Sequence, residues 1–305
     1  MARISDLLAS GPTYSFEFFP PKTDEEQVTL VRALRELEAL APSFVSVTYR
    51  GGRESRRRTY DLVTGILRTT TITPMAHLVC VAHTRLELAE ILVALRNGGI
   101  ENLMALGGDP PTDASAGPGE LQHALQLVEL ARAIGGFSIG VAAHPAGHPL
   151  SPDLASDRRH LAQKLELADF AVTQFFFEKQ QYEGLVDDLA ALGMTKPVLP
   201  GIMPVTSLRS VPRMAQMGAA VPDWAVSRLQ AAHERGGGEA VRKEGIELSC
   251  QLCQAVLDAG APGLHFYTLN RSTATREIYA ALGLTPGGAA PDASRAAGGG
   301  TGAGH

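Results

Sequence analysis

Short apolar runs alternate with longer amphipathic segments along most of the chain, and this alternation constrains the fold more than any other feature. The runs are rich in aromatic and β-branched residues. They span Tyr14–Phe19, Phe44–Thr48, Met75–Val81, Asn102–Leu106, Ser138–Ala142, Phe170–Gln174, Val198–Ile202 and Gly263–Tyr267. Because each run is continuously apolar instead of alternating with polar residues, the pattern predicts parallel strands buried on both faces.

Helical patterns separate these predicted strands. Examples are Glu25–Leu40, Leu86–Arg96, Leu121–Ile134, Arg158–Leu167 and Glu239–Ala259. This alternation of strand and helix, repeated eight times, predicts a (β/α)8 TIM barrel, which is an α/β fold. A doubly wound open sheet is the alternative, but that fold has a Gly-rich first turn, whereas the first strand here runs into Pro20 and Pro21.

The 305 residues fit one large α/β domain. An extra helix is expected at Asp223–Glu234, with Arg235–Gly238 as a linker to the helix that follows. The segment Thr285–His305 is rich in Gly and Ala and carries little apolar surface, so we expect it to be disordered. We therefore predict a single catalytic barrel domain over residues 1–284 and a disordered tail over 285–305.

Composition excludes several classes of protein. The net charge is −5, and the single basic cluster, which includes Arg53 and Arg56, is typical of a solvated helix face, so no nucleic-acid partner is expected. No apolar run reaches the length of a membrane span, and no signal-peptide pattern opens the chain.

Three cysteines argue against a disulfide framework and favour a reducing, cytoplasmic location. Cys250 and Cys253 lie in a helical pattern and are expected to pack.

Polar residues stand at or just after the carboxyl ends of nearly all the predicted strands, where the active site of a TIM barrel lies. They are Glu17, Thr48, His77, Asp109, His144, His148, Gln174, Tyr267 and Arg271. Such convergence on one mouth of the barrel predicts an enzyme.

Glu17 is the most informative of them, because Phe16, Phe18 and Phe19 flank it. An apolar setting raises the pKa of a carboxyl and suits it to act as a general acid, whereas an ion pair with Lys22 is the structural alternative. Asp109 follows Gly107 and Gly108, which let the backbone approach a ligand, although a turn aspartate would look the same. The histidines lack a completing carboxylate or thiolate set, so no metal is expected.

These residues also lie in motifs that resemble the methylenetetrahydrofolate reductase family. The resemblance begins with Ser15-Phe16-Glu17-Phe18-Phe19-Pro20-Pro21-Lys22-Thr23 and closes with His265-Phe266-Tyr267-Thr268-Leu269-Asn270-Arg271. Between them, in order, lie matches at 44–49, 76–78, 102–106 with Gly108-Asp109, 173–177 and 199–205. Together the matches cover residues 15 to about 283 and are highly specific.

The resemblance implies a TIM barrel that reduces methylenetetrahydrofolate to methyltetrahydrofolate through bound FAD and so feeds methionine synthesis. It implies NADH or NADPH as the electron donor, without saying which. The chain resembles the short bacterial form that consists of the catalytic barrel only, and family members are often homo-oligomers.

Site residues follow from the resemblance position by position. Glu17 corresponds to the general acid that opens the folate imidazolidine ring, and Asp109 to the acidic residue that contacts the pterin and tunes the flavin. Gln174, Tyr267 and Arg271 fall on the substrate side. Positions implied to contact FAD are Thr48, His77, Gly108, His123, Ala124, His144, His148, Asp157, His160 and Lys164.

Departures from the family pattern gather around FAD. Gly107 stands where arginine is usual, His123 and His144 where tyrosine is usual, and Ala146 where glutamate is usual. An arginine would supply a fixed charge and a fork of donors, so flavin retention is the open question. Two alternatives therefore remain: a flavin-independent reductase of the same folate with direct hydride transfer, and a folate-binding barrel without reductase activity of its own.

Overall fold

The computed structural model describes residues 1–49, 53–108 and 119–284, with the side chains of Arg53 and Glu54 left aside. Its strands are β1 (Thr13–Phe18), β2 (Phe44–Val47), β3 (Pro74–Val79), β4 (Asn102–Leu106), β5 (Ser138–Ala143), β6 (Phe170–Thr173), β7 (Val198–Leu199), β8 (Gly201–Ile202) and β9 (Gly263–Tyr267). All pairs between them are parallel.

The strand order β7-β6-β5-β4-β3-β2-β1-β9-β8 closes the sheet into a barrel. Its two ends, β7 and β8, are consecutive pieces of one short run of chain that is interrupted at Pro200. The predicted strand Val198–Ile202 is thus divided: β7 pairs with β6, and β8 pairs with β9. Proline lacks the N–H of a ladder residue, but the Pro200 carbonyl still accepts from the His265 backbone N–H at 2.9 Å. The predicted barrel is confirmed.

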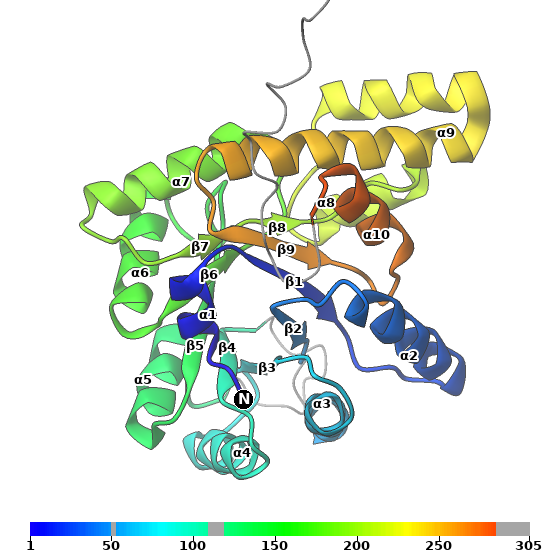
Figure 1. Ribbon diagram of the computed structural model, residues 1–305. Helices are drawn as coiled ribbons and strands as arrows, with labels where there is room; N and C mark the ends of the chain where they lie inside the picture. Colours follow the sequence, from blue (N-terminus) through cyan, green and yellow to red (C-terminus); the bar gives the residue numbers. More distant parts are fainter. Residues whose placement is uncertain (50–52, 109–118, 285–305) are drawn as a thin grey trace, which may run out of the picture.

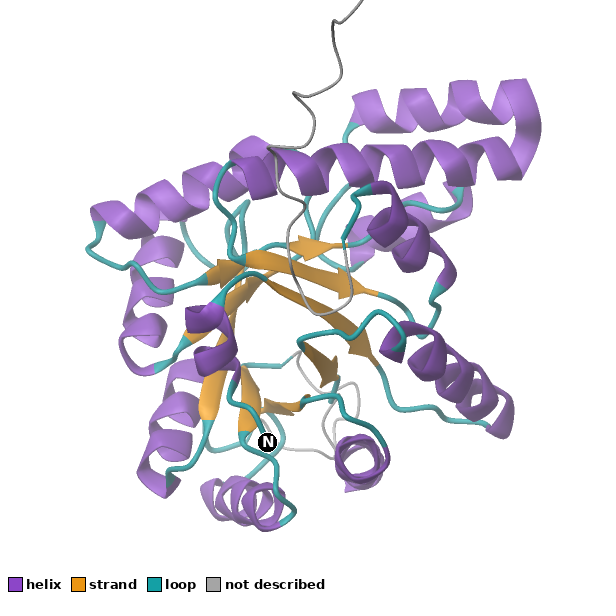
Figure 2. Ribbon diagram, viewed as in Figure 1, coloured by secondary structure: helices purple, strands orange, loops and turns teal. Residues whose placement is uncertain are grey.

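Helices surround the barrel, as Figures 1 and 2 show. They are α1 (Ile4–Ser10), α2 (Asp24–Glu38), α3 (Arg53–Thr69), α4 (Arg85–Asn97), α5 (Ala124–Ile134), α6 (Leu154–Leu167), α7 (Lys179–Ala191), α8 (Val211–Gln216), α9 (Asp223–Asp258) and α10 (Thr273–Ala281), with a 3-10 turn η1 (Leu208–Ser210). Several begin at a side-chain cap: Thr23, Thr84 and Asp153 each accept a backbone N–H of the first turn.

Three helix predictions need correction. The helix expected over Arg158–Leu167 begins earlier, at Leu154, directly after its cap Asp153. The helix expected from Leu121 begins instead at Ala124, since the backbone of His123 is extended. The four-residue linker 235–238 is shorter than expected: only Gly236 and Gly237 leave helical geometry, and the two halves of α9 form a hairpin that projects from the barrel (Figure 1). The C-x-x-C pair packs in the second half, where Cys253 is fully buried and both thiols are free.

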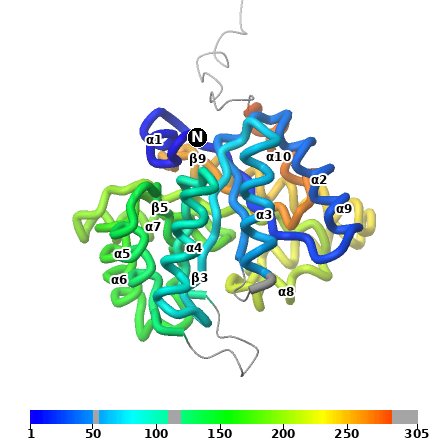
Figure 3. The backbone as a smooth tube through the Cα atoms, turned by 90° about the horizontal axis from the view of Figure 1, so that it is seen from below, coloured from blue at the N-terminus to red at the C-terminus, as the bar shows by residue number. Residues whose placement is uncertain are grey.

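Side chains pointing into the barrel form two layers. Near the amino-terminal strand ends lies an apolar layer, which α1 covers by inserting the fully buried Ile4 among Phe44, Met75 and Phe170. Asn102 fixes α1 in place, since its Oδ1 accepts from the Ile4 N–H at 2.9 Å and its Nδ2 donates to the Ala2 carbonyl at 3.0 Å. Figure 3 shows α1 and α8 at opposite ends of the barrel. The second inward layer, toward the carboxyl ends, is polar.

Two predicted regions cannot be compared with the structure. The tail 285–305 and most of the loop after β4, including Asp109, lie outside the described residues. Among the described helices, none is long and apolar enough to cross a bilayer. The same residues contain no group of three or more His, Cys, Asp and Glu side chains placed to hold a metal ion.

Candidate active site

Glu17 lies in the polar inner layer, and its surroundings differ from those expected from its neighbours in sequence. Phe16 and Phe18 point outward and are fully buried under the helices, because side chains alternate along a strand. The carboxylate points inward and is 19% exposed, and no described Lys or Arg lies within ion-pair distance of it. Its Oε2 lies 3.5 Å from His77 Nε2 and 3.7 Å from His265 Nε2. The expected apolar setting is therefore wrong: Glu17 faces two imidazoles.

His77 comes from β3 and is 7% exposed. Its Nε2 makes no hydrogen bond within the described part of the chain, and the Glu17 carboxylate lies 3.5 Å from it. Burial lowers the pKa of His77, and the nearby Glu17 carboxylate opposes that effect only in part. His77 is therefore neutral near pH 7, and the pair with Glu17 is not a fixed ion pair.

Tyr267 lies beside Glu17 across the β1–β9 ladder. Its hydroxyl donates to the Thr173 carbonyl at 2.6 Å, and its ring packs edge-on against Phe175. Burial, helped by the Glu17 charge, raises the pKa of Tyr267 well above its ordinary value, so the hydroxyl remains protonated. The Tyr267 hydroxyl is therefore engaged with the protein backbone.

Gly201 permits this arrangement by its lack of a side chain. A Cβ at this position would lie 2.3 Å from the Thr173 carbonyl oxygen and 2.6 Å from the Tyr267 ring. The Gly201 N–H donates to Thr173 Oγ1 at 2.8 Å, which ties β6 to β8 beside the tyrosine.

Gln174 follows β6 and is half-buried. Its Nε2 donates to the Met217 carbonyl at 2.9 Å, and its Oε1 accepts from the Phe175 N–H at 3.0 Å. Both ends of the amide thus have partners in the protein, and a ligand that used Gln174 would exchange with them. Arg271, by contrast, is exposed, and its backbone N–H donates to the Thr268 carbonyl at 2.9 Å.

A second group of polar side chains lies after β5 and on α6. The rings of His144 and His148 meet edge to face at 4.6 Å. His148 Nδ1 accepts from the Leu150 N–H, so the ring hydrogen of its neutral form sits on Nε2. Burial, then the neighbouring His148 and Lys164, lowers the pKa of His144 to about 4, and this ring is neutral at pH 7.

Lys164 and Asp157 face this group from α6. Lys164 Nζ donates to the Ala142 carbonyl at 2.9 Å, and none of the described carboxylates is within ion-pair distance of it. Burial lowers the pKa of Lys164 to about 8. An inward-turned ammonium with unused donors and no bonded carboxylate is suited to an anionic ligand such as a dinucleotide phosphate.

Arg158 is a site residue that the sequence interpretation missed. It is almost fully buried and donates to the carbonyls of His144 and Pro145 and to the carboxylates of Asp157 and Asp188. It therefore fixes the turn that carries His144. The available signal was its place as the first residue of the helix predicted over Arg158–Leu167, directly after Asp157.

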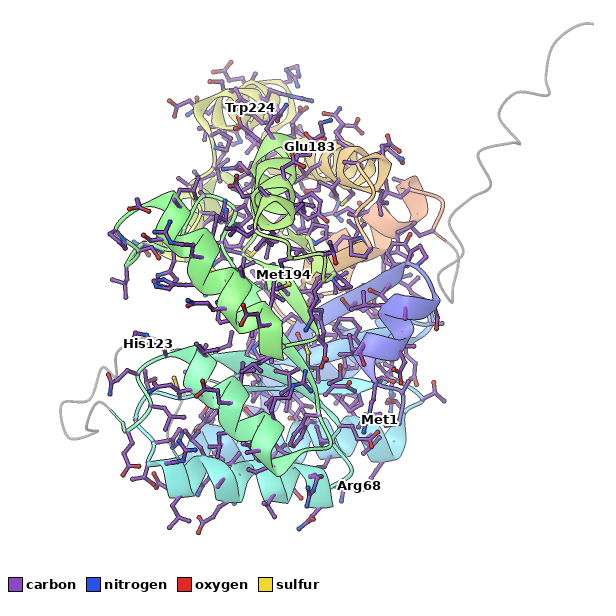
Figure 4. All side chains as sticks on the ribbon, turned by 90° about the vertical axis from the view of Figure 1, so that its left-hand side faces the viewer. Met1, Arg68, His123, Glu183, Met194 and Trp224 are labelled. Atoms are coloured by element: carbon purple, nitrogen blue, oxygen red, sulfur yellow. The ribbon has the colours of Figure 1, made fainter. Side chains whose placement is uncertain are left out.

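The remaining predicted positions lie on the surface or at the ends of helices and strands. His123 and His160 are exposed, and Figure 4 shows His123 at the edge of the molecule. Ala124 opens α5, Thr48 follows β2 with its N–H bonded to the Phe18 carbonyl, and Gly108 is exposed with φ +89°. Asp109 lies outside the described residues.

The barrel with a polar carboxyl-terminal mouth defines the class: a TIM-barrel enzyme. A sequence profile of the methylenetetrahydrofolate reductase family matches residues 3–283, and the chain belongs to that family.

Its relatives support the same assignment. The chain is 34% identical over 275 residues to the 5,10-methylenetetrahydrofolate reductases of Salmonella typhimurium and Escherichia coli, with 90% of this chain and 91% of each relative covered. It is 36% identical to methylenetetrahydrofolate reductase 2 of Saccharomyces cerevisiae, of which 48% is covered. A solved structure of an uncharacterised Clostridium thermocellum protein that binds 5-methyl-5,6,7,8-tetrahydrofolic acid superposes with a TM-score of 0.63. It shares 12% identity, and the match covers 86% of this chain and 91% of that one, so it supports the fold alone.

Proposed function

We propose that this chain reduces methylenetetrahydrofolate to methyltetrahydrofolate with NADH or NADPH as the electron donor, in the pathway that feeds methionine synthesis. Family membership supports the reaction, and one observation carries the mechanism: an inward-facing, partly exposed Glu17 whose Oε2 is turned toward two imidazoles.

In the proposed mechanism Glu17 is the general acid. It gives its proton to a nitrogen of the folate imidazolidine ring, the ring opens to an iminium, and the iminium carbon then accepts the hydride. A general acid contributes roughly a hundredfold to ten-thousandfold in rate. Gln174 would hydrogen-bond the pterin by exchanging one of its protein partners, and Tyr267 would pack its ring against the ligand. Asp109 and Arg271 are proposed to contact folate as the family pattern implies.

We propose FAD as the hydride carrier between the nicotinamide and the folate. The unused donors of Lys164 and the Nε2–H of His148 fit an anionic, hydrogen-bonding cofactor, and they are the observation of this structure that favours it. Thr48, His77, Asp157 and His160 would complete the contacts, together with Gly108, His123, Ala124 and His144. Arg158 would act indirectly by holding the turn 144–145.

Direct hydride transfer from the nicotinamide is the second candidate, and Gly107 favours it. The Gly107 carbonyl accepts from the Val81 N–H and the Cys80 thiol, both at 3.1 Å, so this residue is used to join the loop to the end of β3. It contributes no side-chain cation, and a Cβ there would meet no atom within 4 Å. The half-buried, neutral His144 likewise adds no charge.

The visible absorption spectrum of the freshly purified full chain separates the two candidates. Flavin bands near one equivalent support the FAD-dependent reaction. A colourless protein that reduces methylenetetrahydrofolate with NADH or NADPH, and that added FAD does not stimulate, supports direct transfer. A protein that binds the folate but reduces it under neither condition contradicts reductase activity.

Glu17→Gln tests the role of the acid. The variant should fold and, where flavin is bound, still be reduced by the nicotinamide, but folate turnover should fall at least about a hundredfold. Single-turnover kinetics of the two half-reactions measure this difference. Glu25→Gln, an exposed carboxylate on α2, is the matched control. Equal losses in both half-reactions would contradict the general-acid role.

A further inference from the structure

His83 joins the loop after β3 to the end of β2. Its Nε2 lies 2.6 Å from the Tyr49 hydroxyl, and the two rings are nearly parallel, with 16° between their planes. Both residues are 5% exposed. Tyr49 directly follows Thr48, which the family pattern implies as a contact of FAD. The contact between His83 and Tyr49 therefore acts on the chain next to the proposed cofactor site.

The hydrogen bond between the two rings has a defined direction. His83 Nδ1 lies 3.9 Å from Glu87 Oε2, and because a carboxylate oxygen only accepts, the ring hydrogen is favoured on Nδ1. Glu87 is itself fixed at the start of α4, where its Oε2 accepts from the Thr84 N–H at 2.9 Å. Burial lowers the pKa of His83, and the Glu87 carboxylate opposes this only in part, so the ring is neutral near pH 7. Its Nε2 then accepts from the Tyr49 hydroxyl, whose pKa is raised by burial.

The backbone of the same loop touches the chain after β4 at two places. A Cβ on Gly108 would lie 2.5 Å from Val81 Cγ2, so the chain passes directly against the loop there. Farther along, the Glu120 N–H donates to the His83 carbonyl at 2.9 Å, and the Glu120 carboxylate accepts from the Arg85 N–H at 2.9 Å. His83 thus contacts the end of β2 through its ring and the chain after β4 through its carbonyl.

Ala82, the residue before His83, has a costly backbone conformation. Its φ is +59°, in the left-handed region that a residue with a Cβ adopts only at a cost in free energy. Such conformations persist where surrounding contacts hold them, and they cluster at functional sites. The ring and the carbonyl of His83 supply contacts of this kind. The turn at Ala82 is therefore held in place by more than its own chain.

We infer that His83 is a positioning residue for the cofactor: by holding Tyr49 and Glu120 against the loop after β3, it orders Thr48 and Gly108 before FAD binds. Segments that are ordered in advance lose less conformational entropy on binding, and this increases affinity. Gly107 offers no side-chain cation to the cofactor, so affinity in this chain depends more on such ordering. The inference rests on the proposed FAD site.

Tyr49→Phe tests the contact by removing one oxygen and keeping the ring. The variant should bind FAD about tenfold more weakly, as expected for the loss of one buried hydrogen bond. Fluorescence titration of the flavin-free full chain measures the Kd. At saturating FAD, kcat for folate should equal the wild-type value, because Glu17 is unchanged. Tyr60→Phe on α3 is the matched control, since the Tyr60 hydroxyl has no hydrogen-bond partner among the described residues.

A double-mutant cycle shows whether the two residues act through each other. His83→Phe should weaken FAD binding as much as Tyr49→Phe does, and the double variant should bind no more weakly than either single variant. Hydrogen exchange of the flavin-free chain gives a readout that needs no cofactor. The Glu120 amide should exchange faster in Tyr49→Phe than in the wild type, whereas the His265 amide, bonded to the Pro200 carbonyl, should not change.

Unchanged FAD affinity in Tyr49→Phe would overturn the inference, even if His83→Phe did not fold. Equal losses in Tyr49→Phe and Tyr60→Phe, or additive losses in the cycle, would overturn it as well, because the effect would not pass through this hydrogen bond. A wild-type chain that binds no FAD would instead refute the proposed cofactor. The exchange rate of the Glu120 amide would then decide by itself whether the contact orders the two loops.

Discussion

At the scale of single residues, Glu17 and its partners come from positions that are far apart in the sequence. Glu17 and His265 are separated by 248 residues (265 − 17), and the register of β1 on β9 brings them together. The sequence predicts that both lie on strands and that Glu17 faces the mouth. It does not predict that the Glu17 carboxylate faces histidines. That contact depends on the register between strands and on the alternation of side chains, which turns Phe16 and Phe18 away from Glu17.

Lys164 gives a pH-dependent prediction at the same scale. Its pKa in the free protein is lowered to about 8, and a bound phosphate would raise it, since an anion favours the charged ammonium. Above pH 8, binding must therefore take up a proton, and FAD affinity should fall by up to about tenfold per pH unit. Fluorescence titration with FAD at pH 7, 8 and 9 measures the slope.

The control for this prediction is Lys243→Met, an exposed lysine on α9 whose loss should change neither affinity nor slope. Lys164→Met should bind FAD more weakly at pH 7 and show a flatter profile. An unchanged slope in Lys164→Met would assign the pH dependence to another group.

At the scale of helices and strands, the predictable features are those with a local cause. Asn102–Leu106 and Gly263–Tyr267 match the structure at both ends, because polar or glycine-bearing turns bound each apolar run. The break of the seventh strand also has a local cause, Pro200, which the apolar pattern alone conceals. Helix α1 was not predicted: at seven residues it is too short to be stable alone and depends on contacts with Asn102 and the barrel.

Arg158 illustrates how one element fixes another. Its guanidinium joins α6 to the turn 144–145 and pairs with the buried Asp157. Removing it leaves the buried Asp157 carboxylate without its cationic partner and takes a donor from the carbonyls of His144 and Pro145, so Arg158→Met should lower the free energy of unfolding by about 3–5 kcal/mol. Denaturant unfolding measures this. Its neighbour Arg159 is exposed, and Arg159→Met should stay within about 0.5 kcal/mol. Equal losses in the two variants would mean that the buried contacts contribute little.

At the scale of the whole molecule, the apolar packing and the candidate site lie at opposite ends of the barrel. The apolar layer and α1 lie at the amino-terminal end of the strands, and Glu17, Tyr267 and the turn at His144 lie toward the other end. The alternation of strands and helices predicts the barrel and the end at which the polar residues converge. It cannot predict that α1 covers the opposite end, since this depends on long-range contacts of Ile4 with residues of strands β2 to β7.

Ile4 tests this separation. Its side chain is fully buried among Phe44, Met75, Met104 and Phe170, so Ile4→Ala should leave a cavity and lower the free energy of unfolding by about 2–5 kcal/mol. Because the polar mouth is at the other end of the strands, kcat and KM for folate should remain at wild-type values below the unfolding transition. Val28→Ala on α2, where the side chain is 69% exposed, is the matched aliphatic control and should change stability by no more than about 0.5 kcal/mol. A stability loss together with a comparable fall in kcat would mean that a change in packing under α1 alters the position of Glu17. The two layers of the barrel interior would then be coupled.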